Sequence, residues 1–370
     1  MIINILVILF SIIALIIIHE LGHFLVAKKL GVRVDEFGIG YPPRIAGKKI
    51  GETIYSINLI PFGGFVRIFG EEGEETEIDK ERNFAFRPYW HKLAILVAGV
   101  LAFWLISWPL FSAALLLGSP VSVGDDEQVE NAQVRILDIS KDSPAEQAGL
   151  KTGDIIRGVF YFDEESGSMK ETEVSRIDQF VKIVEKEKSK TISLVLENKN
   201  GKFEKEIVPR ENPPKGQGAL GIGLVRVFDK KYSTTEALVG GFERVFFSTK
   251  SVIYSFGILI KSTYDKEIKE QINLQIVGPV GVGVMLNQSL NWGAGFYLNL
   301  IGFIAVYLAI FNILPIPATD GGQILFLTIE KIRGKGFNKE KQNLINSLFF
   351  AFLIIVMIVI TASDVQRYFF

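Results

Sequence analysis

The chain has 370 residues, of which 48% are hydrophobic and 22% are charged, and its mean hydropathy is +0.30. This composition is too apolar for an ordinary soluble enzyme and too charged for a pure membrane bundle, so it predicts a membrane protein with a soluble insert. The net charge of −1 provides no basic field, which argues against nucleic acid as a partner. Because cysteine is absent, disulfides and thiolate metal ligands are excluded, and His, Asp and Glu remain for metal binding.

An uncharged apolar run from Ile2 to Ile18 leads directly into the His-Glu-Leu-Gly-His sequence at residues 19–23. A helix places positions i and i+4 on one face, so His19 and His23 can bind one metal ion, with Glu20 as the general base. The alternative is that both histidines are simply satisfied in a helix interior. Ionisable groups at membrane depth are costly and usually functional, so the pattern favours a zinc protease site. The run lacks a basic start and a small-residue cleavage site, which argues against a signal peptide.

Four stretches are long enough to cross a bilayer core of about 30 Å. They are Ile3–Val26, Ala94–Gly118, Phe296–Leu314 and Leu344–Thr361. Basic residues are concentrated after the first stretch and between the third and fourth, so these regions are predicted to be cytoplasmic. Both termini and the long middle region would then lie outside the cytoplasm. His91, beside Trp90 and Lys92, is predicted to be an interfacial residue and not a metal ligand.

Residues 121–228 have the composition of a soluble domain. The patterns predict strands at Val134–Ile139, Thr191–Glu197 and Lys202–Val208, and helices that begin at Ser143 and Ser175. Their order, together with the Ser-Pro-Ala, Ala-Gly-Leu and Gly-Asp-Ile-Ile strings of residues 143–156, resembles a PDZ domain of the bacterial, circularly permuted kind. PDZ domains bind peptides by adding a strand to a sheet edge. Gly221, Ile222 and Gly223 are candidates for that groove, with a Gly-rich exit linker as the alternative.

The region from Thr235 to Lys261 is apolar but is interrupted by four charged residues. An amphipathic helix on the outer membrane surface fits this pattern better than a further span.

Two histidines and a water leave a zinc ion one protein ligand short. Asp320 is the clearest candidate at membrane depth, because it follows the sequence Asn-Ile-Leu-Pro-Ile-Pro-Ala-Thr that begins at Asn312. The prolines and glycines there break the helix, and a membrane tolerates such a break only where the freed backbone lines protein or water. The alternative is an Asp that caps a helix at the cytoplasmic boundary.

Three features now point to one family: the His-Glu-x-x-His motif, the PDZ-like insert, and the Asn-x-x-Pro-x-Pro-x-x-Asp-Gly-Gly motif. Over its full length the chain resembles the site-2 protease family of intramembrane zinc metalloproteases, specifically bacterial members like the regulator of sigma-E protease. The resemblance implies one zinc ion bound by His19, His23 and Asp320, with Glu20 activating the water. It also implies that Asn312 holds the substrate or the developing oxyanion, for which a side-chain amide donor is suitable.

Residues 37–44 and 60–67 look like the family's membrane-reentrant β-hairpin, whose exposed edge presents the substrate as an extended strand. Gly63, Gly64 and Phe65 are the candidate substrate-binding residues in this region. Gly278-Pro279-Val280-Gly281 matches a family turn before the third span. One position departs from the family pattern: Phe103 stands where an Asn is common in the second span, so polar support near the metal is expected to differ.

The predicted fold is a polytopic α-helical membrane protein with about four transmembrane helices, a membrane-reentrant β-hairpin and an inserted α+β PDZ domain. The predicted divisions are residues 1–120 for the first membrane half, 121–228 for an extracytoplasmic PDZ domain, 229–292 for amphipathic membrane-surface helices and a linker, and 293–370 for the second membrane half.

The resulting hypothesis is a zinc-dependent intramembrane endopeptidase of the bacterial cytoplasmic (inner) membrane, with its active site toward the cytoplasm. The resemblance implies single-pass membrane protein substrates, with anti-sigma factors and remnant signal peptides as the suggested classes. It also implies that the PDZ domain filters substrates by size or binds their peptide tails.

Two other functions are weighed against this one. A membrane-anchored PDZ scaffold would need metal ligands but no base such as Glu20. A metal-ion transporter would need polar residues along several spans, whereas the sequence shows one cluster.

Overall fold

The computed structural model describes residues 2–71, 79–164, 167–198, 200–214, 216–230, 232–265 and 277–369. Its contacts divide the chain into two compact units. The first unit comprises Met1–Ala113, Thr235–Asn287 and Leu298–Phe370, and the second comprises Ala114–Thr234 and Gln288–Tyr297.

Long apolar helices make up most of the first unit. Its helices are α1 (Ile2–Lys29), α2 (Tyr89–Leu116), α5 (Thr234–Tyr264), α7 (Pro279–Trp292), α8 (Ala294–Ile313), α9 (Asp320–Arg333) and α10 (Lys339–Phe369). Among the described residues, α1, α2, α8 and α10 are the helices long and apolar enough to cross a membrane. A candidate spanning helix thus lies at each of the four predicted spans; the first and fourth are longer than predicted at both ends, and the second begins and ends earlier than predicted.

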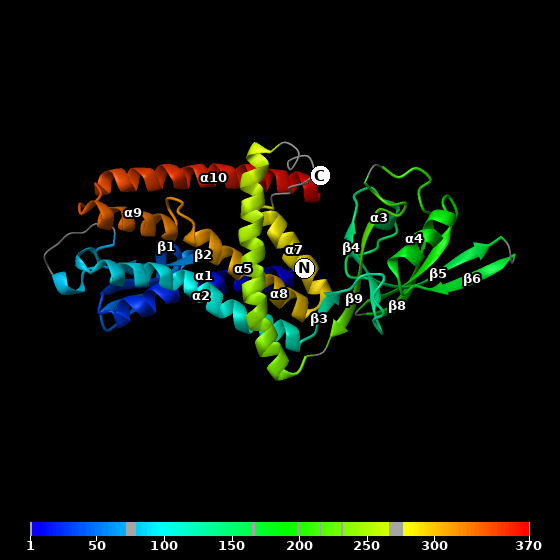
Figure 1. Cartoon of the computed structure of the whole chain (residues 1–370), viewed down its shortest axis with the longest axis horizontal. Helices are drawn as coiled ribbons and strands as arrows, with labels where there is room; N and C mark the ends of the chain where they lie inside the picture. Colours follow the sequence, from blue (N-terminus) through cyan, green and yellow to red (C-terminus); the bar gives the residue numbers. More distant parts are fainter. Residues whose placement is uncertain are drawn as a thin grey trace. The chain divides into compact units, whose positions relative to one another are not determined.

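Helix α5 occupies the region for which an amphipathic helix was predicted, and it is continuous over 31 residues. Trp108 Nε1 of α2 donates to the carbonyl of Leu238 at 2.9 Å, and Arg244 Nη1 donates to Asn299 Oδ1 of α8 at 2.6 Å. Figure 1 shows α5 crossing α2 and α8 instead of running along them. The helix is confirmed, it is not a candidate span, and its place on the membrane surface stays a prediction.

The first unit also contains a small sheet with an edge that no described strand pairs with. Phe37 lies opposite both Tyr55 and Val66, so the first half of β1 is flanked on both sides by β2. The segment from Gly64 to Ile68 is therefore at an edge, and no other described strand pairs with it. A hairpin is confirmed here, whereas its entry into the membrane stays a prediction. The two strands are β1 (Val34–Ile50) and β2 (Thr53–Ile68).

A buried carboxylate connects the two strands of this sheet. Glu36 is 4% exposed, accepts a hydrogen bond from Ser56 Oγ at 2.6 Å, and lies 2.7 Å from Arg44 Nη2. Burial alone raises the pKa of Glu36, but the hydrogen bonds from Ser56 and Arg44 and the charges of Arg44 and Arg67 outweigh burial. The pKa of Glu36 is therefore lowered from its ordinary value of 4.5.

Glu36→Gln is expected to reduce the free energy of unfolding at neutral pH by about 2 kcal/mol, because hydrogen bonds to a charged group are worth about 1.5 to 3 kcal/mol. A carboxylate with a lowered folded-state pKa stabilises the fold fully above its unfolded pKa, and this contribution is lost as the pH falls through the folded pKa. Thermal unfolding in detergent should therefore show the gap between wild type and variant closing below about pH 4.5. A gap that persists at lower pH would contradict the role given to the charge.

The second unit is a mixed domain whose sheet has the strand order β3-β9-β4-β5-β7-β8, with β6 paired to β5. Its core is one cluster of buried side chains, among them Ile136, Val159, Phe180 and Leu194. The strands are β3 (Ser119–Ser122), β4 (Gln133–Ile139), β5 (Ile155–Asp163), β6 (Ser168–Glu173), β7 (Ile192–Asn198), β8 (Gly201–Ile207) and β9 (Ile222–Lys230), and the helices are α3 (Pro144–Gln147) and α4 (Ile177–Lys186).

Most local predictions in this domain are confirmed. The Ser143 side chain caps α3 by accepting from the Glu146 N–H, and Pro144 occupies the first helical position. Strands β7 and β8 form a hairpin that turns at Gly201, as the sequence pattern predicted. The interpretation of Gly221 to Gly223 as an exit linker is wrong, because Ile222 begins β9 and pairs with Ile139. Strand β6 was not predicted, because its surface-exposed residues lack an alternating apolar pattern.

Candidate metal centre

The two histidines of the first helix lie on its one buried stripe. The buried residues of α1 are Ile8, Leu15, His19, His23 and Ala27, which recur at spacings of seven and four. Most of the other side chains are exposed or half-buried, as expected for a helix whose remaining surface faces lipid. Helical periodicity therefore turns both imidazoles away from the exposed surface and toward the neighbouring helices.

Gly22 of α1 and Gly99 of α2 allow the two helices to approach each other closely beside the histidines. A Cβ atom on Gly22 would lie 2.4 Å from the carbonyl oxygen of Ala98, and one on Gly99 would lie 2.2 Å from His23 Nε2. His23 Nδ1 is 2.8 Å from the carbonyl oxygen of Ile95. A carbonyl only accepts hydrogen bonds, so Nδ1 carries the proton and Nε2 keeps a lone pair for a metal ion.

Phe103, the position where the chain departs from the family pattern, lies against the first histidine. Its ring stacks on that of His19, with centroids 4.7 Å apart and planes 22° apart, and it is only 2% exposed. An apolar ring thus fixes the imidazole plane where a polar residue was expected. The sequence marked this position as different but did not indicate what the aromatic ring would contact.

Phe103→Ala is expected to destabilise the protein by about 3 to 5 kcal/mol, because it leaves a cavity in a buried core. It should also weaken zinc retention, since the His19 ring loses the surface that orients it. Zinc content after dialysis and thermal unfolding would measure the two effects. Phe103→Leu is the matched control: it keeps most of the volume and should cost less than about 1.5 kcal/mol. Full zinc retention in Phe103→Ala would contradict the orienting role.

The third candidate ligand begins α9, after a break in the helical chain. Thr319 is the N-cap of α9: its hydroxyl accepts from the Gly322 N–H at 3.4 Å. Asp320 follows in the first turn and is not the capping residue, so the alternative of a capping Asp is not supported. A Cβ atom on Gly321 would lie 2.1 Å from the carbonyl oxygen of Leu314, so only glycine fits where the chain folds back.

The three candidate ligands converge on one point. His19 Nε2 and His23 Nε2 are 3.2 Å apart, and Asp320 Oδ2 lies 3.4 Å from the first and 3.5 Å from the second. Bonds of about 2.0 to 2.2 Å in a tetrahedral zinc site place the ligand atoms about 3.3 to 3.5 Å apart. Asp320 Oδ2 is buried and has no well-oriented hydrogen-bond donor among the described residues. The donor set and its spacing therefore fit a zinc ion.

Glu20 lies between this cluster and the edge of the sheet. Its side chain is half-buried, and the backbone N–H of Val66 lies near its carboxylate. A Cβ atom on Gly64 would lie 3.7 Å from Glu20 Cγ. The carboxylate is thus placed where a proton acceptor could serve a peptide aligned along β2. The sequence alone did not reveal that Val66 would contact it.

The other predicted site residues lie outside the ligand cluster. Asn312 is half-buried near the end of α8, and its Nδ2 donates to the carbonyl of Leu308 at 2.9 Å, so one of its two amide N–H groups is used within its own helix. Within the described residues, the group that could hold a metal contains His19, His23 and Asp320 and not His91. Gly63 has a φ of +93°, which favours glycine, and Phe65 follows in β2.

The predicted turn at residues 278–281 opens α7. The backbone N–H groups of Gly278 and Gly281 donate to Asp364 Oδ2 at 2.9 and 2.7 Å. The turn is therefore held by a carboxylate of α10.

The model of Peptidase family M50 matches residues 7–356 of the chain. The chain belongs to this family. The match includes both histidines, Glu20 and Asp320, and it makes the protein a metallopeptidase.

Several bacterial proteins resemble this M50 peptidase over nearly their full length. Zinc metalloprotease RasP of Oceanobacillus iheyensis is 26% identical, with 95% of this chain and 96% of the relative covered. The regulator of sigma-W protease RasP of Bacillus subtilis is 25% identical, with 96% of each chain covered. Zinc metalloprotease RasP of Geobacillus kaustophilus is 24% identical, again with 96% of each covered. The resemblance to the site-2 protease type is thereby confirmed, and the chain is a bacterial-type membrane metallopeptidase.

Proposed function

We propose that this M50 peptidase is a zinc-dependent endopeptidase that cleaves single-pass membrane proteins within their spanning segments. The observation that carries the proposal is the convergence of His19, His23 and Asp320, with Glu20 beside them, on helices of which α1 is long and apolar enough to span a membrane. The names of the relatives support zinc as the metal. A single zinc ion fits a site with three protein ligands and an open position.

Each residue of the site has a distinct role in this proposal. His19, His23 and Asp320 would hold the zinc ion, which when bound supplies a Lewis acid that polarises the scissile carbonyl and increases the acidity of water. A carboxylate oxygen of Glu20 would take a proton from the attacking water and return it to the leaving amine nitrogen. Asn312 would hydrogen-bond the substrate or the oxyanion through the second N–H of its Nδ2, since the first is donated to the carbonyl of Leu308.

The substrate would be presented as an extended strand. A helical peptide bond is shielded and its backbone is already paired, so a protease needs the chain unwound. The free edge of β2 at Gly64 to Ile68 can pair with such a strand, and Gly64 and Val66 place this edge next to Glu20. Gly63, Gly64 and Phe65 would thus be substrate-binding residues of a hairpin that re-enters the membrane.

The second unit would be an extracytoplasmic PDZ domain within predicted residues 121–228. From Ile222 to Val225, β9 pairs with β4, whereas β3 pairs only with residues from Val227 to Lys230. One edge of β9 is therefore open to a peptide strand, and Gly221 to Gly223 stand at its start. The domain would admit trimmed substrates or bind their tails.

The remaining predictions describe the cellular setting. Residues 229–292 would form membrane-surface helices and a linker, and residues 1–120 and 293–370 the two membrane halves, in the bacterial cytoplasmic membrane. The active site would face the cytoplasm, because basic residues end α1 and α9. Anti-sigma factors and remnant signal peptides are the proposed substrate classes. The name of the Bacillus subtilis relative, a regulator of sigma-W protease, supports a role in transcriptional control.

A comparison of the wild-type protein with Glu20→Gln tests the proposed function. Both proteins, purified in detergent, are analysed for zinc and incubated with a labelled single-span test substrate. We expect about one zinc per chain in both and cleavage by wild type alone, because glutamine leaves the ligands intact but cannot accept the proton. Cleavage by the variant would refute the assigned base. Absence of zinc from both would favour the membrane-anchored scaffold.

A further inference from the structure

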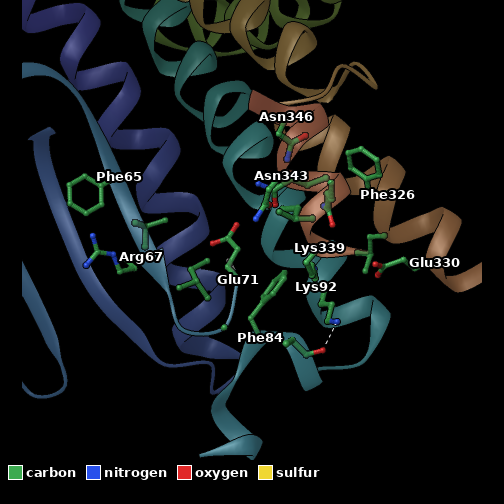
Figure 2. Close-up of a pocket in the computed structure, with 18 of the residues that line it drawn as sticks. Phe65, Arg67, Glu71, Phe84, Lys92, Phe326, Glu330, Lys339, Asn343 and Asn346 are labelled. Carbon is green, nitrogen blue, oxygen red and sulfur yellow. Dashed lines mark hydrogen bonds between the residues drawn. The ribbon is translucent and has the colours of Figure 1, made fainter. Parts of the chain in front are cut away.

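A cavity of about 500 Å³ lies in the first unit next to the edge of β2. Figure 2 shows the strand residues Phe65 and Arg67 on one side of it and the helix residues Phe326, Lys339, Asn343 and Asn346 on the other. Its volume falls within the range of about 300 to 1,000 Å³ that is typical of ligand sites. Four side-chain amides contribute to its lining, and we call it the amide-lined cavity. They are Gln323, Gln342, Asn343 and Asn346.

The amide-lined cavity continues from the candidate active site. One wall is the β2 segment from Phe65 to Ile68, which directly follows Gly64, where an added Cβ would lie 3.7 Å from Glu20 Cγ. On the opposite wall, Gln323 lies one helical turn beyond Asp320 in α9. A polypeptide whose scissile bond lies at Glu20 and whose strand follows β2 therefore passes into this cavity.

The polar lining suits a peptide main chain. The side-chain amides of Gln323 and Asn343 make no hydrogen bond with other described residues, and Gln342 Oε1 is buried without a partner. Asn346 Oδ1 accepts from the Ala318 N–H at 3.3 Å, which leaves its NH₂ group available. An amide offers both donors and an acceptor, as does each peptide unit of a bound chain.

The charged and aromatic lining narrows the ligand class further. Cationic and anionic side chains both line the cavity, so it does not select a ligand of one sign of charge. The charged lining residues are Arg67, Lys92, Lys339, Glu71 and Glu330. Glu330 already accepts from the Phe337 N–H at 2.7 Å. Phe84 and Phe326 add apolar surface for one or two uncharged side chains. The combination fits an uncharged polar segment of polypeptide in an extended conformation.

We propose that the amide-lined cavity binds the flank of the substrate that leaves the membrane on the active-site side. The lining amides would recognise this flank by hydrogen bonds to the main chain of the substrate. The proposal rests on the proposed function, because it assumes a membrane-spanning substrate cleaved at Glu20. Lys331, which lies 4.0 Å from the ring centre of Tyr89 and 4.4 Å from that of Trp90, marks the membrane boundary near the lining residues of α9. The occupant is thus the segment just outside the span.

Disulfide trapping tests this placement directly, because the chain has no cysteine of its own. Asn343→Cys is combined with Glu20→Gln, and single cysteines are placed along the cytoplasmic flank of the test substrate. We expect crosslinks at flank positions a few residues beyond the scissile bond and none in the opposite flank. Lys341→Cys is the matched control, since it is an exposed neighbour on α10 outside the lining. Equal trapping by both variants would overturn the proposal.

Kinetics provide a second, independent test. With Glu20 intact, Asn343→Ala should raise KM about fivefold, with kcat little changed, for a substrate that carries the flank, because a hydrogen bond contributes a factor of about 2 to 12. With the flank removed, wild type and variant should have the same KM. Lys341→Ala should match wild type throughout. If wild type cleaves the substrate but Asn343→Ala has an unchanged KM and Asn343→Cys gives no crosslink, the cavity proposal fails while the proposed function stands. If wild type cleaves nothing, both fail.

Discussion

Gly99→Ala is expected to empty the metal site. The added Cβ would lie 2.2 Å from His23 Nε2 and 2.6 Å from His19 Cε1, so both imidazoles would have to move. Neither ring moves freely, because His23 is hydrogen-bonded to Ile95 and His19 is stacked on Phe103. A displacement of about 1 Å costs about 100-fold in catalysis, so we expect cleavage to fall by at least that factor and zinc content to fall well below one per chain.

A glycine with free space around it provides the control for this substitution. Apart from its chain neighbours and its own helix backbone, Gly283 of α7 has no described atom within 4 Å of the position that an added Cβ would take, so Gly283→Ala should keep zinc and activity. Zinc content and cleavage are measured for both variants, and circular dichroism shows whether the helices remain. Normal zinc content in Gly99→Ala would show that α1 and α2 do not approach as closely as the structure has them.

Asp320→Asn is expected to lower zinc affinity by more than about 100-fold, since even partners beyond the ligands contribute about 10- to 100-fold. The substitution keeps the shape of the side chain but removes the negative charge beside the two imidazoles. Cleavage should disappear together with zinc, in contrast to Glu20→Gln, which should lose cleavage and keep zinc. Titration with a chelator of known affinity would rank wild type, Glu20→Gln and Asp320→Asn.

Adding excess zinc to Asp320→Asn distinguishes a weakened metal site from a damaged fold. If Asp320→Asn only weakens binding, excess zinc should restore part of its cleavage activity. Replacing the N-cap instead, as in Thr319→Val, should destabilise the start of α9 by about 1 kcal/mol while leaving all three ligands in place. Unchanged zinc affinity in Asp320→Asn would rule out this carboxylate as the third ligand.

The arrangement of His19, Glu20 and His23 was predictable because it is local. Positions 19 and 23 share a helix face whatever else the chain does, and Glu20 is fixed beside them by sequence. The four spans were predictable for a similar reason, since length and hydropathy alone decide whether a helix can cross a bilayer. In the second unit, the Ser143 cap and the Gly201 hairpin depend only on neighbouring residues.

The sequence by itself therefore determined that His19, Glu20 and His23 lie together on one helix and that the chain has four candidate spans. Only the tertiary structure placed Asp320 within 3.5 Å of both histidines, stacked Phe103 on His19 and brought Val66 to Glu20. It also made α5 cross the helices it packs on and formed the amide-lined cavity. These contacts join segments far apart in the chain, and they depend on how closely whole helices and strands pack, which no local pattern of residues encodes.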